Sequence, residues 1–518
     1  MIRDLDSLVS RTLDVLVVGG GITGLAVAYD AAQRGLAVGL VDRDDFGNAA
    51  AIRQWPIVSG DVRLPSATTR HDARERQTLA RLAPHALQPV ACVVPIYRSL
   101  RHGTLATRTA FAAGSVIRSK RARDLPPSLR LPRARVVSRG HAIQRFPGLR
   151  RQGLTGAAVF HDYLAPEPDR LVFAFAQAAA EHGASLANYV EALAPLVDGR
   201  RVVGVRARDA VSGRTIEINA RVTINATGPA IDALLTRLDA AIGVPMQNRL
   251  TLVTTRDAGE EVLGGFGEGR RPLYLVPWRQ RAIFGPWYGD TDVPAFIKQL
   301  NQAFPALDLS TKDITLVHRA SVPAPAGDHA IDHGATGVDG VISAIAASAV
   351  TARALAERVT DLALVKLARA ASACRTAETI LPGGSLRDVG AAIGEVRREY
   401  DAGLPTDAVP HVLVAYGSRH RELLELAVDR PEWRARVAAG SPVIGAELVH
   451  AARAEMVTRL ADAVVRRTPI GALGEPGEEG LTRAAEIVGG ELRWPADRVR
   501  EEIAAVRTLY GTLKPLKT

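Results

Sequence analysis

The most informative pattern of apolar and polar positions lies near the start of the chain. A mainly apolar run at 13–18 is typical of a buried parallel strand, and residues 22–34 predict a helix that ends at Gly35. A second apolar run at 36–41 ends on Asp42. Between the first run and the helix stand glycines at the G-x-G-x-x-G spacing: Gly19, Gly21 and Gly24. Strand, glycines, helix, strand and acid in this order predict a dinucleotide-binding unit.

Each residue type in this unit has a physical role at a bound dinucleotide. Gly19 permits a tight turn, Gly21 lets the backbone approach a pyrophosphate, and Gly24 lets the helix pack against the strand. The helix N-terminus offers N–H groups to phosphate, and the acid accepts ribose hydroxyls. We expect the cofactor contacts of this unit to be Gly19, Gly21, Ile22, Thr23, Gly24, Asp42 and Arg43. The alternative is a glycine-rich turn with a structural role only.

The remaining pattern continues as alternating strands and helices up to about residue 380. It predicts helices over 71–87, 168–182 and 293–304, and strands over 90–96, 190–223 and much of 250–325. The basic, proline-containing segment 118–140 predicts a surface crossing. After an apolar strand at 222–224, Thr227 and Gly228 form a second glycine turn, where we expect a second cofactor contact.

The composition shifts near residue 381. Helical spacing dominates from there, for example in 407–427, 445–466 and 494–510, and predicts a separate all-α domain at 381–518. Residues 1–380 then form an α/β region. We expect its cofactor-binding segments at about 10–95, 150–245 and 330–370, and an inserted mixed-sheet substrate layer at about 96–150 and 246–329.

Composition and charge exclude several classes of protein. The chain has 518 residues, 47% of them hydrophobic, and no apolar run long enough to span a membrane, so a soluble multidomain protein is expected. Two distant cysteines, Cys92 and Cys374, predict neither a disulfide framework nor a metal site and fit a reducing cytoplasm. The net charge of +10 is spread along the chain, which argues against nucleic acid as a partner.

The motifs resemble those of the FAD-dependent glycerol-3-phosphate dehydrogenases, a family with the glutathione-reductase-type, Rossmann-like fold. The resemblance covers nearly the whole chain. It is carried by "DVLVVGGGITGLAVAYDAAQRGLAVGLVDRDDF", "RLAPHALQPVACVVPIY", "LTGAAVFHD", "INATGPAID" and "LYLVPW", and later by "LPGG", "AYGSR" and "AELVHAARAEMVTRLADAVVRRTPIG". It implies non-covalent FAD and two-electron oxidation of a small alcohol. Electrons would pass to a quinone, oxygen or another acceptor, with at most peripheral membrane contact, and a homodimer is left open.

The sequence departs from that family at the positions that hold the substrate phosphate. The resemblance places the family's lysine near Trp55 or Pro56 and its histidine near Val58. It places Val322 at the phosphate-binding arginine and Ser348 at a second lysine. Because lysine and bidentate arginine normally hold a dianionic phosphate, these replacements predict a site reshaped for a less charged or bulkier molecule.

Flavin-dependent oxidation of an alcohol also needs a base for the hydroxyl proton. His318 is the candidate base and Arg319 a candidate anion contact; the alternatives are a hydrogen-bonded structural histidine and a surface arginine. Candidate substrate contacts are Arg53, Trp287, Tyr288 and Ser348, although the two aromatic residues equally suit a strand core.

Three functional hypotheses follow. The first is a flavoenzyme of altered specificity for a small alcohol or related metabolite. The second is a genuine, quinone-linked glycerol-3-phosphate dehydrogenase, and the third is an FAD-binding pseudoenzyme that serves as an interaction protein. Retention of every cofactor glycine favours the first.

Overall fold

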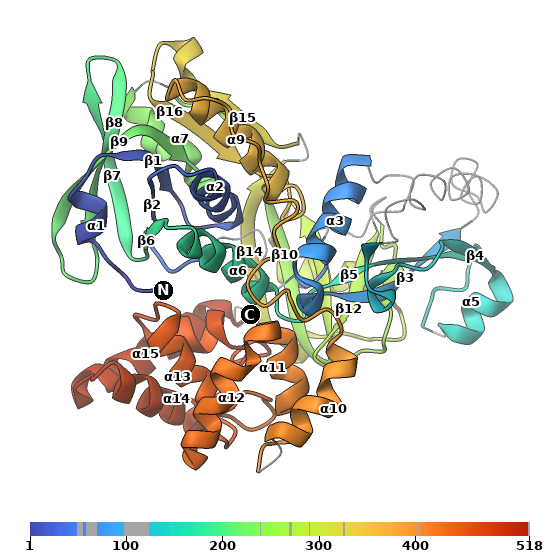
Figure 1. Cartoon of the computed structure of the whole chain (residues 1–518). Coiled ribbons are helices and arrows are strands. Elements are labelled where there is room, and N and C mark those ends of the chain that lie inside the picture. The colour runs from blue at the N-terminus through green and yellow to red at the C-terminus, as the bar shows by residue number, and fades with distance from the viewer. Residues whose placement is uncertain are drawn as a thin grey trace.

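The computed structural model describes residues 1–48, 55–58, 70–97, 124–146, 148–238, 240–268, 272–289, 291–324, 327–400 and 403–515. These residues form two β-sheets that lie side by side and a helical domain beneath them (Figure 1). The amino group of Met1 donates to the carbonyl of Ala454 at 2.7 Å, so the first residues lie against the helical domain.

The first sheet contains the predicted nucleotide-binding strands. Its order is β15-β16-β9-β1-β2-β6, and β7 and β8 extend β9 as an antiparallel meander. All neighbours from β16 to β6 are parallel, whereas β15 is antiparallel to β16. The strands are β1 (Leu13–Val18), β2 (Val38–Val41), β6 (Ser185–Ala187), β7 (Val190–Asp198), β8 (Arg201–Asp209), β9 (Thr215–Asn225), β15 (His329–Asp332) and β16 (Val341–Ile345).

Both faces of strand β1 are buried, which explains its unbroken apolar run. Val15 and Val17 pack in the core under the helices, while Leu16 and Val18 pack with residues of the β7–β9 meander. The covering helices are α2 (Ile22–Gln33), α6 (Pro168–Glu181) and α9 (Ala352–Lys366), with the short α1 (Asp6–Val9) and α7 (Ile231–Leu235) near the meander. The segment 190–223, predicted as a pair of strands, contains three.

The second sheet has the order β14-β10-β13-β12-β11-β3-β5-β4. Its strands are β3 (Gln88–Tyr97), β4 (Arg135–Ser138), β5 (Leu154–Leu164), β10 (Met246–Asp257), β11 (Val262–Gly265), β12 (Leu273–Trp278), β13 (Arg281–Tyr288) and β14 (Ile314–Pro323). Helix α8 (Val293–Ala303) covers one face through Phe296 and Leu300, and α3 (Arg70–Leu82) and α5 (Arg139–Arg145) lie at the β3–β5 side.

Two strands from segments that the sequence assigned to cofactor binding lie in the second sheet. The predicted boundaries placed residues 88–95 and 154–164 with the cofactor-binding unit, but β3 and β5 pair with each other in the second sheet. β3 also pairs with β11 in parallel. An apolar run predicts a strand without identifying its partner, and β5 is followed by helix α6, as β1 in the first sheet is followed by α2.

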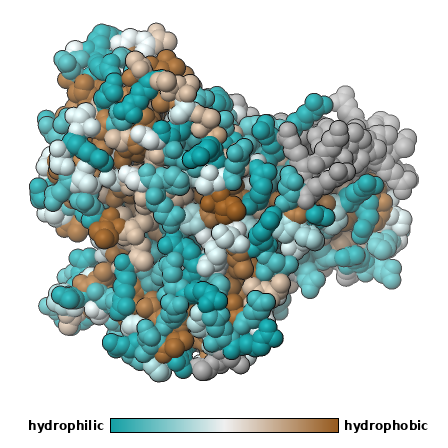
Figure 2. Space-filling model, in the orientation of Figure 1, coloured by the Kyte–Doolittle hydropathy of each residue, from teal (hydrophilic) through white to brown (hydrophobic). Residues whose placement is uncertain are grey.

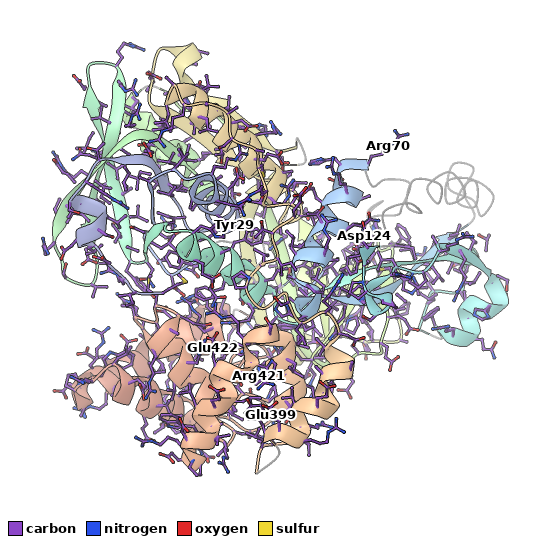
Figure 3. All side chains as sticks on the ribbon, in the orientation of Figure 1. Tyr29, Arg70, Asp124, Glu399, Arg421 and Glu422 are labelled. Atoms are coloured by element: carbon purple, nitrogen blue, oxygen red, sulfur yellow. The ribbon has the colours of Figure 1, made fainter. Side chains whose placement is uncertain are left out.

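The helical domain is formed by α10 (Val389–Tyr400), α11 (Ala408–Tyr416), α12 (His420–Asp429), α13 (Gly445–Ala454), α14 (Gly477–Glu491) and α15 (Ala496–Leu513). On its surface the Arg421 guanidinium of α12 donates to both carboxylate oxygens of Glu399 in α10, at 2.6 and 2.9 Å (Figure 3). Leu448 and Leu481 share a core with Val90 and Val253 of the second sheet. The domain therefore packs on the sheet face opposite α8.

The visible face of the molecule is largely hydrophilic, with small, scattered apolar patches (Figure 2). Among the described residues, the helices are all too short or too polar to cross a bilayer.

Candidate functional site: a dinucleotide pocket between the two sheets

The glycine turn after β1 has the shape that a bound pyrophosphate requires. Gly19 has φ +111°, and a Cβ there would lie 2.4 Å from the carbonyl oxygen of Ala226. A Cβ on Gly24 would lie 1.8 Å from the carbonyl oxygen of Gly19, so only glycine lets α2 begin this close to β1. Gly21 is the N-cap of α2, and its backbone, Ile22 and Thr23 line the pocket. This arrangement fits phosphate at a helix N-terminus.

Asp42 stands at the end of β2, beside the same turn. Its Oδ2 accepts from the backbone N–H of Gly20 at 2.5 Å, and its Oδ1 accepts from that of Asp44 at 2.7 Å. Burial raises the pKa of Asp42 to about 6, although both N–H groups oppose that shift. Asp42 lines the pocket, where a carboxylate accepts ribose hydroxyls. The neighbouring Arg43 is exposed, with its guanidinium 3.6 Å from Asp44.

The predicted second turn lies directly opposite the first. The N–H of Ala226 donates to the carbonyl of Val18 at 2.9 Å, which joins the ends of β9 and β1. The Thr227 hydroxyl donates to Asn225 at 2.7 Å, and Gly228 has φ +58°. Thr227 and Gly228 both line the pocket with Gly19 and Gly21. The structure thus brings the two predicted glycine turns together at one cavity.

Two of the positions that depart from the family pattern line this same cavity. Val322 and its neighbours Ser321 and Pro323 reach it from the end of β14, which lies against the second turn. Ser348 reaches it from the loop before α9, with its hydroxyl 3.4 Å from that of Thr351. The structure therefore places a valine and a serine beside the dinucleotide turns.

The registers of β10 and β14 decide which side chains share a face with Val322. His318 lies within β14, not at its end, and pairs with Thr251; Leu250 pairs with Arg319. Because successive side chains alternate, His318 and Val322 lie on one face and Arg319 on the other. His318 is buried and Arg319 is exposed. The structure does not bring His318 and Arg319 together.

The two aromatic candidates, Trp287 and Tyr288, also lie on opposite faces of the second sheet. Trp287 pairs with Leu250 and stacks on Phe296 of α8, with ring centroids 4.8 Å apart, so it belongs to the core beneath α8. Tyr288 pairs with Arg249 and lies on the face that carries His318. This placement favours the core interpretation for Trp287 and keeps Tyr288 a candidate.

The remaining candidates of the 43–60 loop are only partly covered. Arg53 lies outside the described residues. Trp55 is buried in the core between the second sheet and the helical domain. The N–H of Val58 donates to the carbonyl of Tyr163 at 3.2 Å, so Val58 adjoins β5.

Sequence reasoning missed Arg249. It is buried in β10, pairs with Ala320, and shares its face with Thr251, Tyr288 and His318. A polar residue at a position that alternates with buried leucines, as in residues 248–252, was the available signal. A buried cation on this face is the natural partner for an anionic group.

The cavity is thus suited to a dinucleotide, with backbone donors for phosphates and a carboxylate for ribose. Among the residues described, no group of three histidine, cysteine or acidic side chains is placed to hold a metal ion.

Comparison with known proteins agrees with this geometry. A family model described as FAD dependent oxidoreductase matches residues 14–362. A model described as the C-terminal domain of alpha-glycerophosphate oxidase matches residues 374–499. A glycerol-3-phosphate dehydrogenase of Synechocystis sp. is 25% identical over 97% of each chain. The mitochondrial enzyme of Homo sapiens is 27% identical over 95% of this chain and 72% of its own.

Solved structures share the fold. The glycerol-3-phosphate dehydrogenase from Bacillus halodurans, complexed with FAD, superposes with a TM-score of 0.79 at 22% identity, over 99% of this chain and 97% of its own. L-proline dehydrogenase from P. horikoshii matches 70% of this chain and 96% of its own, with a TM-score of 0.52 and 17% identity. The predicted family, fold class and FAD cofactor are confirmed by these findings.

Proposed function

This chain belongs to the FAD-dependent oxidoreductase family, and we propose that it oxidises a small alcohol with a specificity that differs from that of glycerol-3-phosphate dehydrogenases. The observation that carries the proposal is the placement of Val322 and Ser348 at the dinucleotide cavity. The resemblance assigns an arginine and a lysine to these positions. Without them the cavity lacks two charge-assisted contacts to a phosphate.

In the proposed reaction, bound FAD supplies a two-electron acceptor. His318 accepts the proton of the substrate hydroxyl, because it is a buried imidazole on the strand face that leads to Val322. Tyr288 and Arg249 orient the substrate from the neighbouring strands. Arg319, exposed on the opposite face, has no part in this proposal. The electron acceptor is a quinone, oxygen or another oxidant.

A genuine glycerol-3-phosphate dehydrogenase is the second candidate. Arg249 favours it, because a buried guanidinium on the face shared with His318 offers an anion contact that replaces the missing pair. The names of the relatives, glycerol-3-phosphate dehydrogenases from several organisms, support the same candidate.

Anaerobic mixing with candidate substrates tests the proposal. We expect glycerol 3-phosphate to bleach the flavin absorbance slowly and at least one uncharged or singly charged small alcohol to bleach it faster. Introducing Ser348→Lys with Val322→Arg should raise kcat/KM for glycerol 3-phosphate by about tenfold or more, because each restored charge-assisted contact contributes over 1 kcal/mol.

The outcomes separate the three hypotheses. Efficient oxidation of glycerol 3-phosphate by the unmodified protein would establish the second candidate and place the phosphate on other residues. Bleaching by dithionite but by no alcohol in the panel would support a pseudoenzyme.

A further inference from the structure

A buried ion cluster joins the cofactor-binding region to the helical domain. Asp45, in the turn 42–48 after β2, accepts two hydrogen bonds from the Arg467 guanidinium at 2.7 and 2.9 Å. Its Oδ2 also accepts from Nε of Arg466 at 2.7 Å. Both arginines end the π-helical turn Asp462–Arg467, between α13 and α14. We propose that Arg466 and Arg467 are positioning residues for FAD, which hold the ribose side of its site through Asp45.

The turn 42–48 forms one wall of the dinucleotide cavity. The N–H of Gly47 donates to the carbonyl of Gly20 at 2.9 Å, and Asp42 accepts from the N–H of Gly20. Asp42 and Gly47, on either side of Asp45, both line the cavity. The position of Asp45 therefore fixes the two residues of this turn that face the cofactor.

The carboxylate of Asp45 is held as an ion in spite of its burial. Burial alone raises its pKa, but Arg467 and Arg466 outweigh that effect and lower the pKa of Asp45 to about 2. Nδ2 of Asn188 completes its shell at 3.0 Å. A fully satisfied buried ion pair resists displacement, because removing either partner leaves an uncompensated charge.

The two arginines are fixed from the other side by the helical domain. Nε of Arg467 donates to the carbonyl of Glu455 at 3.1 Å. Arg466 pairs with Asp462, whose carboxylate also accepts from the N–H groups of Thr458 and Arg459 at 2.8 and 2.9 Å. From the cofactor-binding region, the ring of Phe173 in α6 also contacts Arg467, with its centroid 4.0 Å from the guanidinium carbon. A shift of the helical domain would move Asp45 with it.

Cofactor binding and docking of the helical domain are then coupled. If docking places Asp42 for the ribose, bound FAD must in turn favour the docked domain by the same free energy. This inference rests on the FAD site alone and does not depend on the identity of the substrate.

The experiment compares two buried arginines that each make a bidentate ion pair, one inside the cluster and one outside it. Arg467→Lys retains the charge but loses the bidentate contact to Asp45. Arg353→Lys is the matched control, because Arg353 in α9 makes an equivalent bidentate pair with Glu75 in α3, at 2.7 and 2.9 Å, outside the helical domain. The readout is the rate at which holoenzyme releases FAD, followed by the rise in flavin fluorescence.

We expect Arg467→Lys to release FAD about tenfold faster than the unmodified protein, as the loss of one charge-assisted hydrogen bond implies. Arg353→Lys should stay close to the unmodified rate. Equal rates for all three proteins, or equal acceleration in both variants, would overturn the proposal.

Hydrogen exchange on the unmodified protein decides the matter if a variant fails to fold. Removing FAD should accelerate exchange in the peptide 456–468 and leave the distant helix α15 unchanged. Unchanged exchange in 456–468, or the same change in both segments, would contradict the coupling.

Discussion

At the scale of single residues, Asp42 carries the most direct consequence for cofactor binding. Its folded-state pKa of about 6 lies above the ordinary value of 3.8 because the side chain is desolvated. The cofactor-free protein therefore loses stability as pH rises from about 4 through 6, because its folded state holds the Asp42 proton more tightly than the unfolded chain does. The ionised carboxylate, in contrast, is the form that accepts hydrogen bonds from ribose hydroxyls best. FAD binding must then release a proton in that range.

We predict that FAD affinity falls as pH decreases through about 6. Titration of flavin-depleted protein with FAD at several pH values, followed by fluorescence quenching, measures this dependence. Asp42→Asn should bind FAD more weakly at pH 7 and with little change below pH 6. If the FAD affinity of Asp42→Asn falls with decreasing pH in the same way as that of the unmodified protein, the proton released on FAD binding comes from another group.

Arg249 is a buried residue that the sequence analysis did not select and that we propose as a substrate contact. We predict that Arg249→Gln raises KM for an anionic substrate by about tenfold or more and lowers kcat less, because the contact is made in the ground state as well. Arg256→Gln is the control, since Arg256 lies on the same strand, is exposed and pairs with Asp313. Steady-state kinetics with both variants measures KM and kcat. Equal KM values for Arg249→Gln and Arg256→Gln would show that Arg249 does not contact the substrate.

At the scale of elements, the sequence predicted the first unit closely, but it did not identify how the strands of the second sheet pair. The strand expected at 13–18 is β1 with the same bounds, and the helix expected at 22–34 is α2, because spacing and glycines act locally. The pairing of β3 with β5 joins residues that are far apart in the sequence, such as Cys92 and Phe160. His318 and Arg319 point in opposite directions because side chains alternate along a strand, but the register decides that His318 pairs with Thr251 and Arg319 with Leu250.

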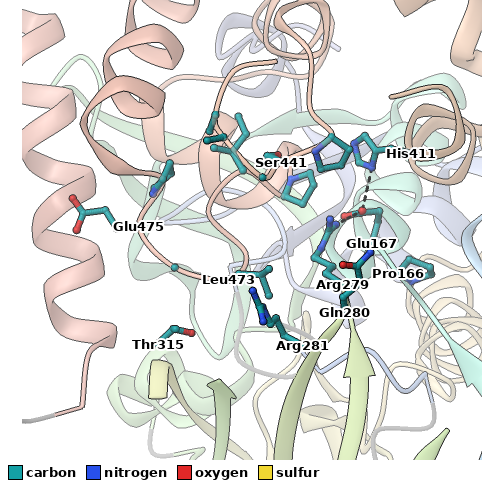
Figure 4. Close-up of a pocket in the computed structure, with 18 of the residues that line it drawn as sticks. Pro166, Glu167, Arg279, Gln280, Arg281, Thr315, His411, Ser441, Leu473 and Glu475 are labelled. Atoms are coloured by element: carbon teal, nitrogen blue, oxygen red, sulfur yellow. Dashed lines mark hydrogen bonds and ion pairs between the residues drawn. The ribbon is translucent and has the colours of Figure 1, made fainter. Parts of the chain in front are cut away.

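A second element-scale feature is the contact of α11 with the start of α6. There His411 lies at the wall of a cavity of about 1560 Å³ between the second sheet and the helical domain (Figure 4). Its Nε2 is 3.0 Å from Glu447, and its Nδ1 is 3.5 Å from Glu167, which also pairs with Arg279. Burial lowers the pKa of His411, but the carboxylates of Glu447 and Glu167 outweigh burial and raise this pKa to about 9.

Because the pKa of His411 is raised, its charged imidazolium stabilises the fold fully below about pH 6.5, and this stabilisation is lost as pH rises through 9. We predict that His411→Gln lowers Tm by several degrees at pH 6 and by much less at pH 10. Thermal unfolding across that range measures the difference, with the exposed His141→Gln as the control. A constant difference at all pH values would show that His411 acts through packing only.

At the scale of the whole molecule, the dinucleotide cavity lies where the two glycine turns and the end of β14 meet. The residues that line this cavity include no histidine, cysteine or tyrosine among those described. Cys92 is buried in the second sheet, and Cys374 lies beside Arg353 and Thr376. These positions support the expectation of non-covalent FAD, and acid precipitation should release flavin into the supernatant; a yellow pellet would contradict it.

Two glycines of one turn separate cofactor binding from folding. Gly21 has φ −74°, which any residue adopts, and it lines the cavity; Gly24 has no room for a Cβ beside Gly19. We predict that Gly21→Val yields folded but colourless protein, because its side chain occupies the pyrophosphate position. Gly24→Val should fail to fold, because the clash is with backbone. At a free concentration of a hundred times Kd, added FAD should stabilise the flavin-depleted unmodified protein by about 2.7 kcal/mol and so raise its Tm. The Tm of Gly21→Val should not change. Yellow, stabilised Gly21→Val protein would place the pyrophosphate elsewhere.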